Sequence, residues 1–169
     1  PVHRDCDYGR SVTDETTSPL RPETFVVTAG RPPRTPDAPL NTPIVPASSF
    51  IAGGPMEYAR EDAPSAHALE EVIGGLEGGS ATVFSSGMAA AGAAMDLVPQ
   101  GAVIVAPSAA YTGVAVRLRE LHAIGRIELR IVEVDRTPDV IEACSGAHLL
   151  WLESPTNPLL QVADLPACI

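Results

Sequence analysis

The feature that most constrains the fold is an alternation of helix-like and strand-like segments that begins near Pro64 and continues along the chain. Short apolar runs, rich in β-branched residues, predict buried strands at 81–86, 101–107, 127–135 and 148–154. Segments with helical periodicity are found at 65–79, 87–98, 112–125 and 137–146. Strands that alternate with helices in this way predict an α/β fold with a doubly wound, mostly parallel sheet.

Two helix boundaries have specific signals. The helix at 65–79 carries a stripe of apolar residues and is predicted to stop at Gly78-Gly79. The stripe consists of Ala68, Leu69, Val72, Ile73 and Leu76. The helix at 137–146 is predicted to have Thr137 as its cap and Pro138 at its first position.

Residues 1–60 are predicted to form an extended N-terminal arm, and residues 61–169 the beginning of the α/β domain. Proline recurs along the arm, and each proline restricts its predecessor and removes a hydrogen-bond donor. Residues 1–20 are also consistent with a disordered tail. The apolar stretches "TFVVTAG" (24–30) and "TPIVPASSF" (42–50) favour an arm that lies on a surface.

Composition excludes several classes of protein. The chain has 169 residues, a hydrophobic content of 45% and a net charge of −10, so nucleic-acid binding is not expected. No apolar run reaches the roughly 18 residues of a membrane span, and no signal peptide is recognisable at the start. Three widely spaced cysteines and four histidines match no metal pattern. These features predict a cytoplasmic protein with reduced thiols and no metal.

All eleven cationic side chains are arginines. At ordinary usage a chain of this length would contain about ten lysines. A lysine that performs catalysis therefore cannot belong to this chain.

Three polar motifs follow predicted strands, at the edge where open α/β sheets bind ligands. The first is Ser86-Gly87-Met88, where a strand turns directly into a helix and free amides could hold a phosphate. The second is Tyr111, whose ring could stack on a planar ligand while its hydroxyl exchanges protons. Taken singly, these motifs are equally consistent with a tight turn and with an aromatic residue that closes the core edge.

The third motif is "ESPTNP" (153–158), in which two prolines fix the backbone after a buried strand. Glu153, Thr156 and Asn157 would then be presented in set directions for polar recognition of a ligand, although a rigid turn also fits. Upstream, Tyr58 and Arg60 lie two residues apart in an extended segment and so face the same side. A hydroxyl beside a guanidinium suits a phosphate, and a solvated arginine beside a loop aromatic is the alternative.

In order along the chain, "TPIVPASSF", "YAR", "ALEEVIGGLEGG", "SSGMAA", "YTG" and "WLESPTNP" closely resemble the pyridoxal-phosphate enzymes of cysteine and methionine metabolism. This is the transsulfuration family of cystathionine γ-synthase, cystathionine γ-lyase, homoserine sulfhydrylases and methionine γ-lyase. The resemblance runs from about Glu23 to the last residue. It implies an aminotransferase-like (fold type I) cofactor domain, incomplete in this chain, and γ-elimination or γ-replacement on a sulfur amino acid or activated homoserine.

The resemblance also implies roles for individual residues. Gly87 and Met88 would cradle the phosphate of pyridoxal 5'-phosphate beside Ser86, and Tyr111 would stack on its ring and assist proton transfer. Asn157 would bind the ring's phenolic oxygen, with Glu153 nearby. Tyr58 and Arg60 would reach the cofactor phosphate of a neighbouring subunit in a homodimer or homotetramer.

Two stretches depart from the family's pattern. Asp62-Ala63-Pro64-Ser65 replaces the usual Gly-Asn-Pro-Thr, and Thr112-Gly113 replaces Gly-Gly or Gly-Cys. In the family, the Schiff-base lysine, the aspartate at the pyridine nitrogen and the arginine for the substrate carboxylate come later in the chain. The sequence therefore predicts the N-terminal portion of such an enzyme, which would not fold stably by itself.

Two other readings remain open at this stage. A truncated, non-catalytic relative would bind a phosphate compound or a partner subunit, as the absence of lysine suggests. Another phosphate-binding α/β enzyme, such as an aminotransferase of the same fold, would leave the Tyr-x-Arg motif of the arm without a role.

Overall fold

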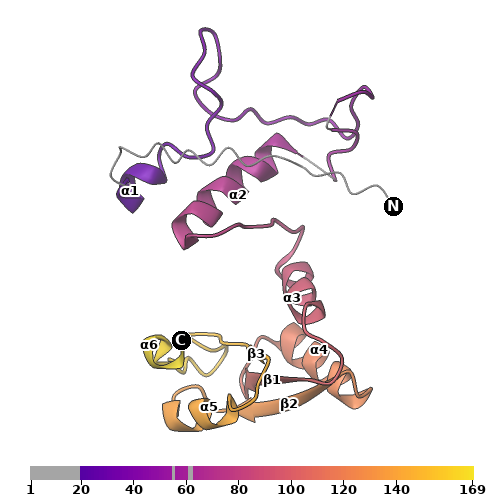
Figure 1. The fold of residues 1–169 in the computed structure, drawn as a ribbon, viewed down its shortest axis with the longest axis vertical. Coiled ribbons are helices and arrows are strands. Elements are labelled where there is room, and N and C mark those ends of the chain that lie inside the picture. Colours follow the sequence, from indigo (N-terminus) through magenta and orange to yellow (C-terminus); the bar gives the residue numbers. More distant parts are fainter. Residues whose placement is uncertain (1–19, 55, 61–62) are drawn as a thin grey trace. The chain divides into compact units, whose positions relative to one another are not determined.

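The structure of the chain is a computed structural model that describes residues 20–54, 56–60 and 63–169. The described residues form two compact units, one ending at Val83 and the other beginning at Phe84 (Figure 1). This division by compactness differs from the predicted division at residue 60, which separates the chain by role and stays a prediction.

In the first unit, helices α1 (Pro22–Phe25) and α2 (Pro64–Glu77) pack together. A Cβ atom added to Gly75 would overlap the Phe25 ring, so only glycine at this position lets the ring approach α2 so closely. Helix α2 ends as predicted, with Gly78 in the left-handed conformation (φ 69°) as its cap.

The apolar stripe of α2 is only partly covered within the described chain. Leu69, Ile73 and Leu76 retain 49%, 44% and 42% of their exposure, respectively.

The segment around Tyr58 turns back on the preceding residues. Ser49 and Tyr58 form an isolated antiparallel bridge, with hydrogen bonds from Phe50 N to Glu57 O (3.0 Å) and from Ala59 N to Ser48 O (3.1 Å). Arg60 follows in a turn. The predicted extended geometry from Tyr58 to Arg60 is therefore wrong, and helix α1 likewise interrupts the predicted extended arm.

The second unit is built on a three-stranded parallel sheet. Its strands are β1 (Ala102–Pro107), β2 (Ile127–Val132) and β3 (Leu149–Leu150), in the order β2-β1-β3. The register places Ala102 opposite Ile127 and Ile104 opposite Leu149. Strand β1 lies in the centre, as its nearly complete burial requires.

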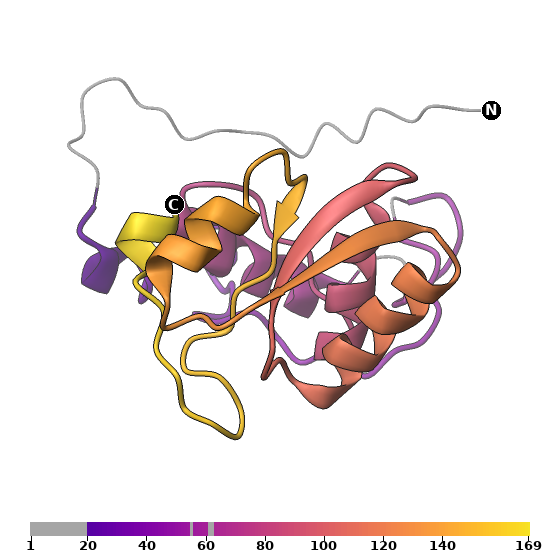
Figure 2. The same ribbon diagram turned by 90° about the horizontal axis from the view of Figure 1, so that it is seen from below.

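Helices cover both faces of this sheet (Figure 2). Alternate residues of β1, namely Ala102, Ile104 and Ala106, form a core with α3 (Gly87–Asp96) and α4 (Thr112–Ala123). Val105, which points the opposite way, packs with Val140 of α5 (Thr137–Ala143). The last helix, α6 (Leu165–Cys168), lies against α5. The predicted mostly parallel sheet with flanking helices is confirmed.

Three further local predictions are wrong. Residues 81–86 do not form a strand, because none of their backbone groups is part of a strand ladder in the described chain, and Val83 N instead donates to Glu70 Oε1 (2.8 Å). Strand β3 is shorter than predicted, since the strand itself consists of Leu149 and Leu150. The N-cap position of α5 is Arg136, which makes no side-chain capping hydrogen bond, so Thr137 is the first helical residue and Pro138 the second.

Within the described ranges, none of the helices combines the length and the apolar content needed to span a bilayer.

Candidate functional site

A hollow of about 620 Å³ opens in the second unit, beside the first turns of α3 and α4 and the end of β3. It brings together residues that the sequence predicts for one site, although they lie up to 67 positions apart, from Ser86 to Glu153. The lining comprises Ser86, Gly87, Met88, Ala90, Ala91, Tyr111, Val114, Trp151 and Glu153. Of the predicted residues in this unit, Thr156 and Asn157 are not among those that line it.

The first turn of α3 forms one wall of the hollow. Ser86 is extended (φ −158°) and caps the helix, its Oγ accepting a hydrogen bond from Ala89 N at 3.1 Å. The amides of Gly87 and Met88 precede the first internally bonded turn, so they remain available to an anion. A Cβ on Gly87 would meet nothing within 4 Å, which leaves open space directly against the backbone.

Glu153 joins the other two walls. One carboxylate oxygen accepts a hydrogen bond from Tyr111 N at 2.7 Å, and the other accepts one from Trp151 Nε1 at 3.0 Å. Tyr111 stands just before α4, and Trp151 just after β3. A single carboxylate thus holds the start of α4 against the end of β3 and sets the position of the Tyr111 ring.

Gly113 is a residue of this site that the sequence reasoning missed as a structural requirement. A Cβ on Gly113 would come within 2.8 Å of Met88 Sδ and 2.9 Å of Tyr111 Cε1. Glycine therefore permits the thioether and the aromatic ring to pack over α4. The signal was present as the Thr112-Gly113 departure, but the sequence does not show what approaches it.

Trp151 was also missed, although it lies in the quoted motif "WLESPTNP". Its indole lines the hollow and its N–H is bonded to Glu153. Its backbone N donates to Val105 O (2.9 Å), which continues the pairing of β3 with β1 by one residue.

In the loop after β3, the polar residues predicted for the site differ in exposure. Thr156 is 1% exposed, and its Oγ1 accepts a hydrogen bond from Gln161 N at 3.0 Å, so it closes the loop rather than recognising a ligand. Asn157 is exposed. The peptide bonds that precede Pro155 and Pro158 are cis.

Beside this loop, hydrogen bonding lowers the pKa of Glu133, just past β2. The main cause is the Gln161 amide, whose Nε2 lies 2.8 Å from Glu133 Oε2, and the Ser108 side chain adds to it. Gln161 Nε2 also approaches Asp135 Oδ1 at 3.4 Å. At this carboxyl end of the sheet, the Gln161 amide therefore favours the ionised form of Glu133.

In the first unit, Tyr58 and Arg60 are paired. The Arg60 guanidinium carbon lies 4.7 Å from the centroid of the Tyr58 ring, within the range of a cation–π contact. The guanidinium thus lies over the aromatic ring, and the expectation that the Tyr58 hydroxyl and Arg60 bind a phosphate together stays a prediction.

The histidines are engaged in structural contacts. His148 Nδ1 accepts a hydrogen bond from Val103 N (3.1 Å), and His122 Nδ1 lies 3.2 Å from Ile127 O. His67 Nδ1 lies 3.3 Å from Glu70 Oε2, whereas His3 is outside the described residues. Among the residues that the structure describes, no three His, Cys, Asp or Glu side chains are grouped to hold a metal ion.

A parallel α/β sheet with a hollow at the start of a helix, rimmed by an aromatic ring and a carboxylate, defines a small-molecule site of the phosphate-binding kind. A family model described as "Cys/Met metabolism PLP-dependent enzyme" matches residues 23–169. The chain therefore belongs to this family, whose members depend on pyridoxal phosphate and act as lyases or transferases.

Individual relatives agree with this assignment. Cystathionine γ-synthase of Mycobacterium tuberculosis is 33% identical over 157 residues, which are 86% of this chain and 40% of the relative. Cystathionine β-lyase of Bacillus subtilis is 33% identical over 124 residues, 72% of this chain and 32% of the relative. The structure of Xanthomonas oryzae cystathionine γ-synthase with cystathionine superposes with a TM-score of 0.75 at 28% identity, covering 90% of this chain and 41% of that one. The chain thus spans about two fifths or less of the length of these relatives.

The hollow fits a pyridoxal phosphate group. Open space at Gly87 and two amides suit the phosphate, and the exposed face of Tyr111 suits the ring. The chain contributes no lysine to bind the aldehyde.

Proposed function

We propose that the protein containing this chain catalyses pyridoxal-phosphate-dependent γ-elimination or γ-replacement on a sulfur amino acid or an activated homoserine. The observation that carries the proposal is the convergence of Gly87, Met88, Tyr111 and Glu153 on one hollow. When bound, the cofactor supplies an electron sink for carbanions on the substrate.

The residues of the chain have distinct parts in this proposal. The Gly87 and Met88 amides bind the phosphate, and the positive end of α3 stabilises its charge. Tyr111 lies against the ring, and its hydroxyl holds or releases a proton at the leaving group. Glu153 orients Tyr111 through the 2.7 Å bond to its backbone N. Asn157 binds the phenolic oxygen once its exposed side chain is turned to the ring.

The test is turnover by the full-length protein loaded with cofactor. With cystathionine and water, cleavage at the γ carbon yields cysteine, 2-oxobutanoate and ammonia, whereas cleavage at the β carbon yields homocysteine, pyruvate and ammonia. With an O-acylhomoserine and cysteine, replacement yields cystathionine and the free acid. Formation of 2-oxobutanoate or cystathionine supports the proposal, and pyruvate alone replaces it with β-elimination.

Two variants of Tyr111 separate its two roles. Tyr111→Phe keeps the ring and removes the hydroxyl, so turnover falls while cofactor affinity is retained. Tyr111→Leu also removes the ring and lowers cofactor affinity. Equal turnover by wild type and Tyr111→Phe would remove the hydroxyl from the mechanism.

We also propose that Tyr58 and Arg60 complete the site of a neighbouring subunit in a homodimer or homotetramer. The proposal is supported by the 4.7 Å contact of the Arg60 guanidinium with the Tyr58 ring, which keeps the two side chains close, and by the affinity of guanidinium groups for phosphate. Mixing Arg60→Ala subunits with Tyr111→Leu subunits tests this arrangement. In the proposed assembly each hybrid pair contains one intact site, so activity returns on mixing. Residues that served their own subunit would leave both hybrid sites defective.

The absence of lysine from the chain favours one alternative, a non-catalytic module that binds a phosphate compound or a partner subunit. It predicts cofactor binding by the full-length protein that borohydride does not fix, together with no turnover of any of these substrates.

A further inference from the structure

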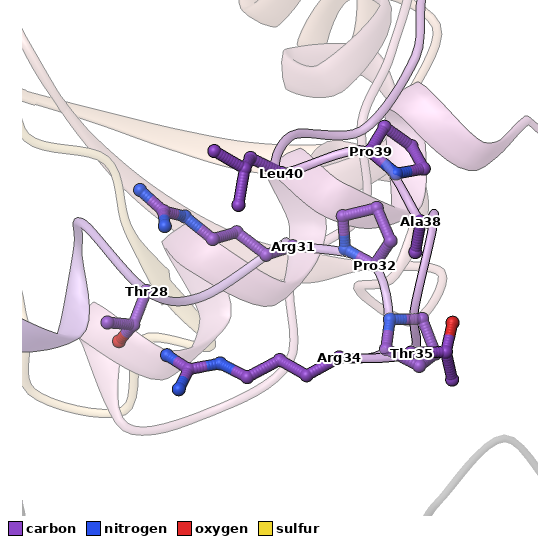
Figure 3. A pocket seen from close by; sticks show the side chains of 9 residues that line it. Thr28, Arg31, Pro32, Arg34, Thr35, Ala38, Pro39 and Leu40 are labelled. Atoms are coloured by element: carbon purple, nitrogen blue, oxygen red, sulfur yellow. The ribbon is translucent and has the colours of Figure 1, made fainter.

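The loop at 31–41 in the first unit encloses a second hollow, of about 520 Å³. Arg31 and Arg34 line it together with Thr28 and apolar side chains of the loop (Figure 3). Neither arginine is part of the hollow beside α3 and α4. The resemblance to the family assigned no role to either residue.

The base of this loop is fixed. Thr42 Oγ1 donates a hydrogen bond to Gly30 O, which joins the two ends of the loop. Gly30 adopts φ 68°, and a Cβ there would lie 2.5 Å from Ala68 O, so the loop begins in close contact with α2. Its ends are therefore held together, as in a compact surface loop with a defined shape.

The rest of the loop is restrained as well. Four of its eleven residues are prolines, at 32, 33, 36 and 39. Hydrogen bonds from Thr35 N to Pro33 O (2.9 Å) and from Ala38 N to Thr35 O (3.1 Å) form successive turns. Proline fixes φ, so the loop backbone loses less entropy when a ligand orders it. Arg31 and Arg34 therefore extend from a backbone that is already restrained.

The two guanidinium groups extend to the same side of the loop, with Thr28 between their ends (Figure 3). The Thr28 hydroxyl, which also lines the hollow, donates to Thr24 O and Phe25 O at 3.0 and 3.1 Å, so its position is fixed. Within the described ranges, neither guanidinium makes an ion pair or hydrogen bond. Asp37, the acidic residue of the loop, is not among the residues that line the hollow.

Charge and size together indicate the kind of ligand. Two guanidinium forks that line one hollow match two anionic groups or one dianion. The net charge of −10 disfavours a polyanion such as nucleic acid, and the volume falls within the range of small-molecule sites. Pro32, Pro39 and Leu40 offer apolar walls.

We propose that this hollow binds a small organic dianion, a dicarboxylate or a phosphate ester, between Arg31 and Arg34. The site is separate from the cofactor hollow and does not depend on the proposed reaction. Carboxylate and phosphate share the chemistry that the two guanidinium groups recognise, so the ligand experiment must distinguish them.

The test is isothermal titration calorimetry of the full-length protein with its cofactor bound, in a low-salt buffer free of both anions. The probes are succinate and inorganic phosphate, titrated separately. We expect saturable binding of at least one probe, weakened by added salt. In Arg31→Gln/Arg34→Gln its Kd rises at least about tenfold, since hydrogen bonds to charged groups are lost.

The matched control is Arg117→Gln/Arg119→Gln, which removes the same charge from exposed positions of α4. We expect its Kd to stay within about twofold of the wild type, because those residues lie outside the hollow. If the double loop variant does not retain the wild-type circular dichroism, the single variant Arg34→Gln takes its place. An absence of saturable binding by both probes, or an equal loss of affinity in the loop variant and the control, would overturn the proposal.

Discussion

Replacement of Glu153 by glutamine changes one atom of the carboxylate that joins α4 to β3. In the wild type, each oxygen of Glu153 accepts one N–H, from Tyr111 at 2.7 Å and from the Trp151 indole at 3.0 Å. Glutamine has a single acceptor oxygen, and its amide nitrogen would face the remaining donor. One of the two bonds must therefore be lost.

The expected cost follows from the kind of bond. A hydrogen bond to a charged group contributes about 1.5–3 kcal/mol, and access of water to the hollow reduces this to about 1–2 kcal/mol. A change of 1.4 kcal/mol corresponds to about a tenfold change in an equilibrium constant. Glu153→Ala removes both acceptors, so its effect should be about twice as large in free energy.

Amide hydrogen exchange at Tyr111 measures this effect directly. We expect exchange to be about tenfold faster in Glu153→Gln when the Tyr111 bond is the one lost, and faster in Glu153→Ala in every case. The control is Glu120→Gln, which makes the same change of charge on α4, the helix that Tyr111 precedes. It should leave the exchange rate of the Tyr111 amide unchanged. An unchanged Tyr111 rate in Glu153→Ala would refute the assigned role of this carboxylate.

Two further predictions concern packing and pH. Gly113→Ala gains about 1 kcal/mol of helix propensity but overpacks Met88 and Tyr111 at a cost of about 1–3 kcal/mol, so cofactor affinity should fall about tenfold with a small decrease in Tm. A higher Tm with unchanged cofactor affinity would contradict this packing. The pKa of Glu133 is lowered in the folded state, so its bond to Gln161 stabilises the fold fully at a pH above the ordinary pKa of 4.5. This contribution is lost as the pH falls through the lowered pKa of the folded state. Between pH 7 and 3, the Tm of Glu133→Gln should therefore fall less steeply than that of the wild type. Identical profiles of Tm against pH would exclude a stabilising role for the Glu133 carboxylate.

The order of the elements could be predicted from the sequence because each element carries its own local signal. Periodicity located α2 to α5, and Gly78 ended α2 as expected. The prediction of a strand at 81–86 was wrong for a non-local reason. A β-branched run becomes a strand only where a partner supplies the ladder, and no strand pairs with it in the described chain.

The residues of the candidate site likewise divide into those that could be predicted from local signals and those that could not. Residues that follow strands or begin helices, such as Gly87 and Tyr111, could be grouped because the topology of parallel sheets brings those positions to one edge. The bond of Glu153 to Trp151 and the approach of Met88 to Gly113 depend on side-chain packing between elements. Such packing has no signature within a single segment, so sequence reasoning missed it.

Trp151 gives the hollow an optical property of its own. It is the only tryptophan of the chain, it lines the hollow, and its indole is held in place by Glu153. A pyridine chromophore bound beside it would accept its excitation energy, so its emission intensity and lifetime would report how much of the site is filled. Subtracting the emission of Trp151→Phe would isolate this signal from any other tryptophan of the full-length protein, and the site would thus carry its own probe of occupancy.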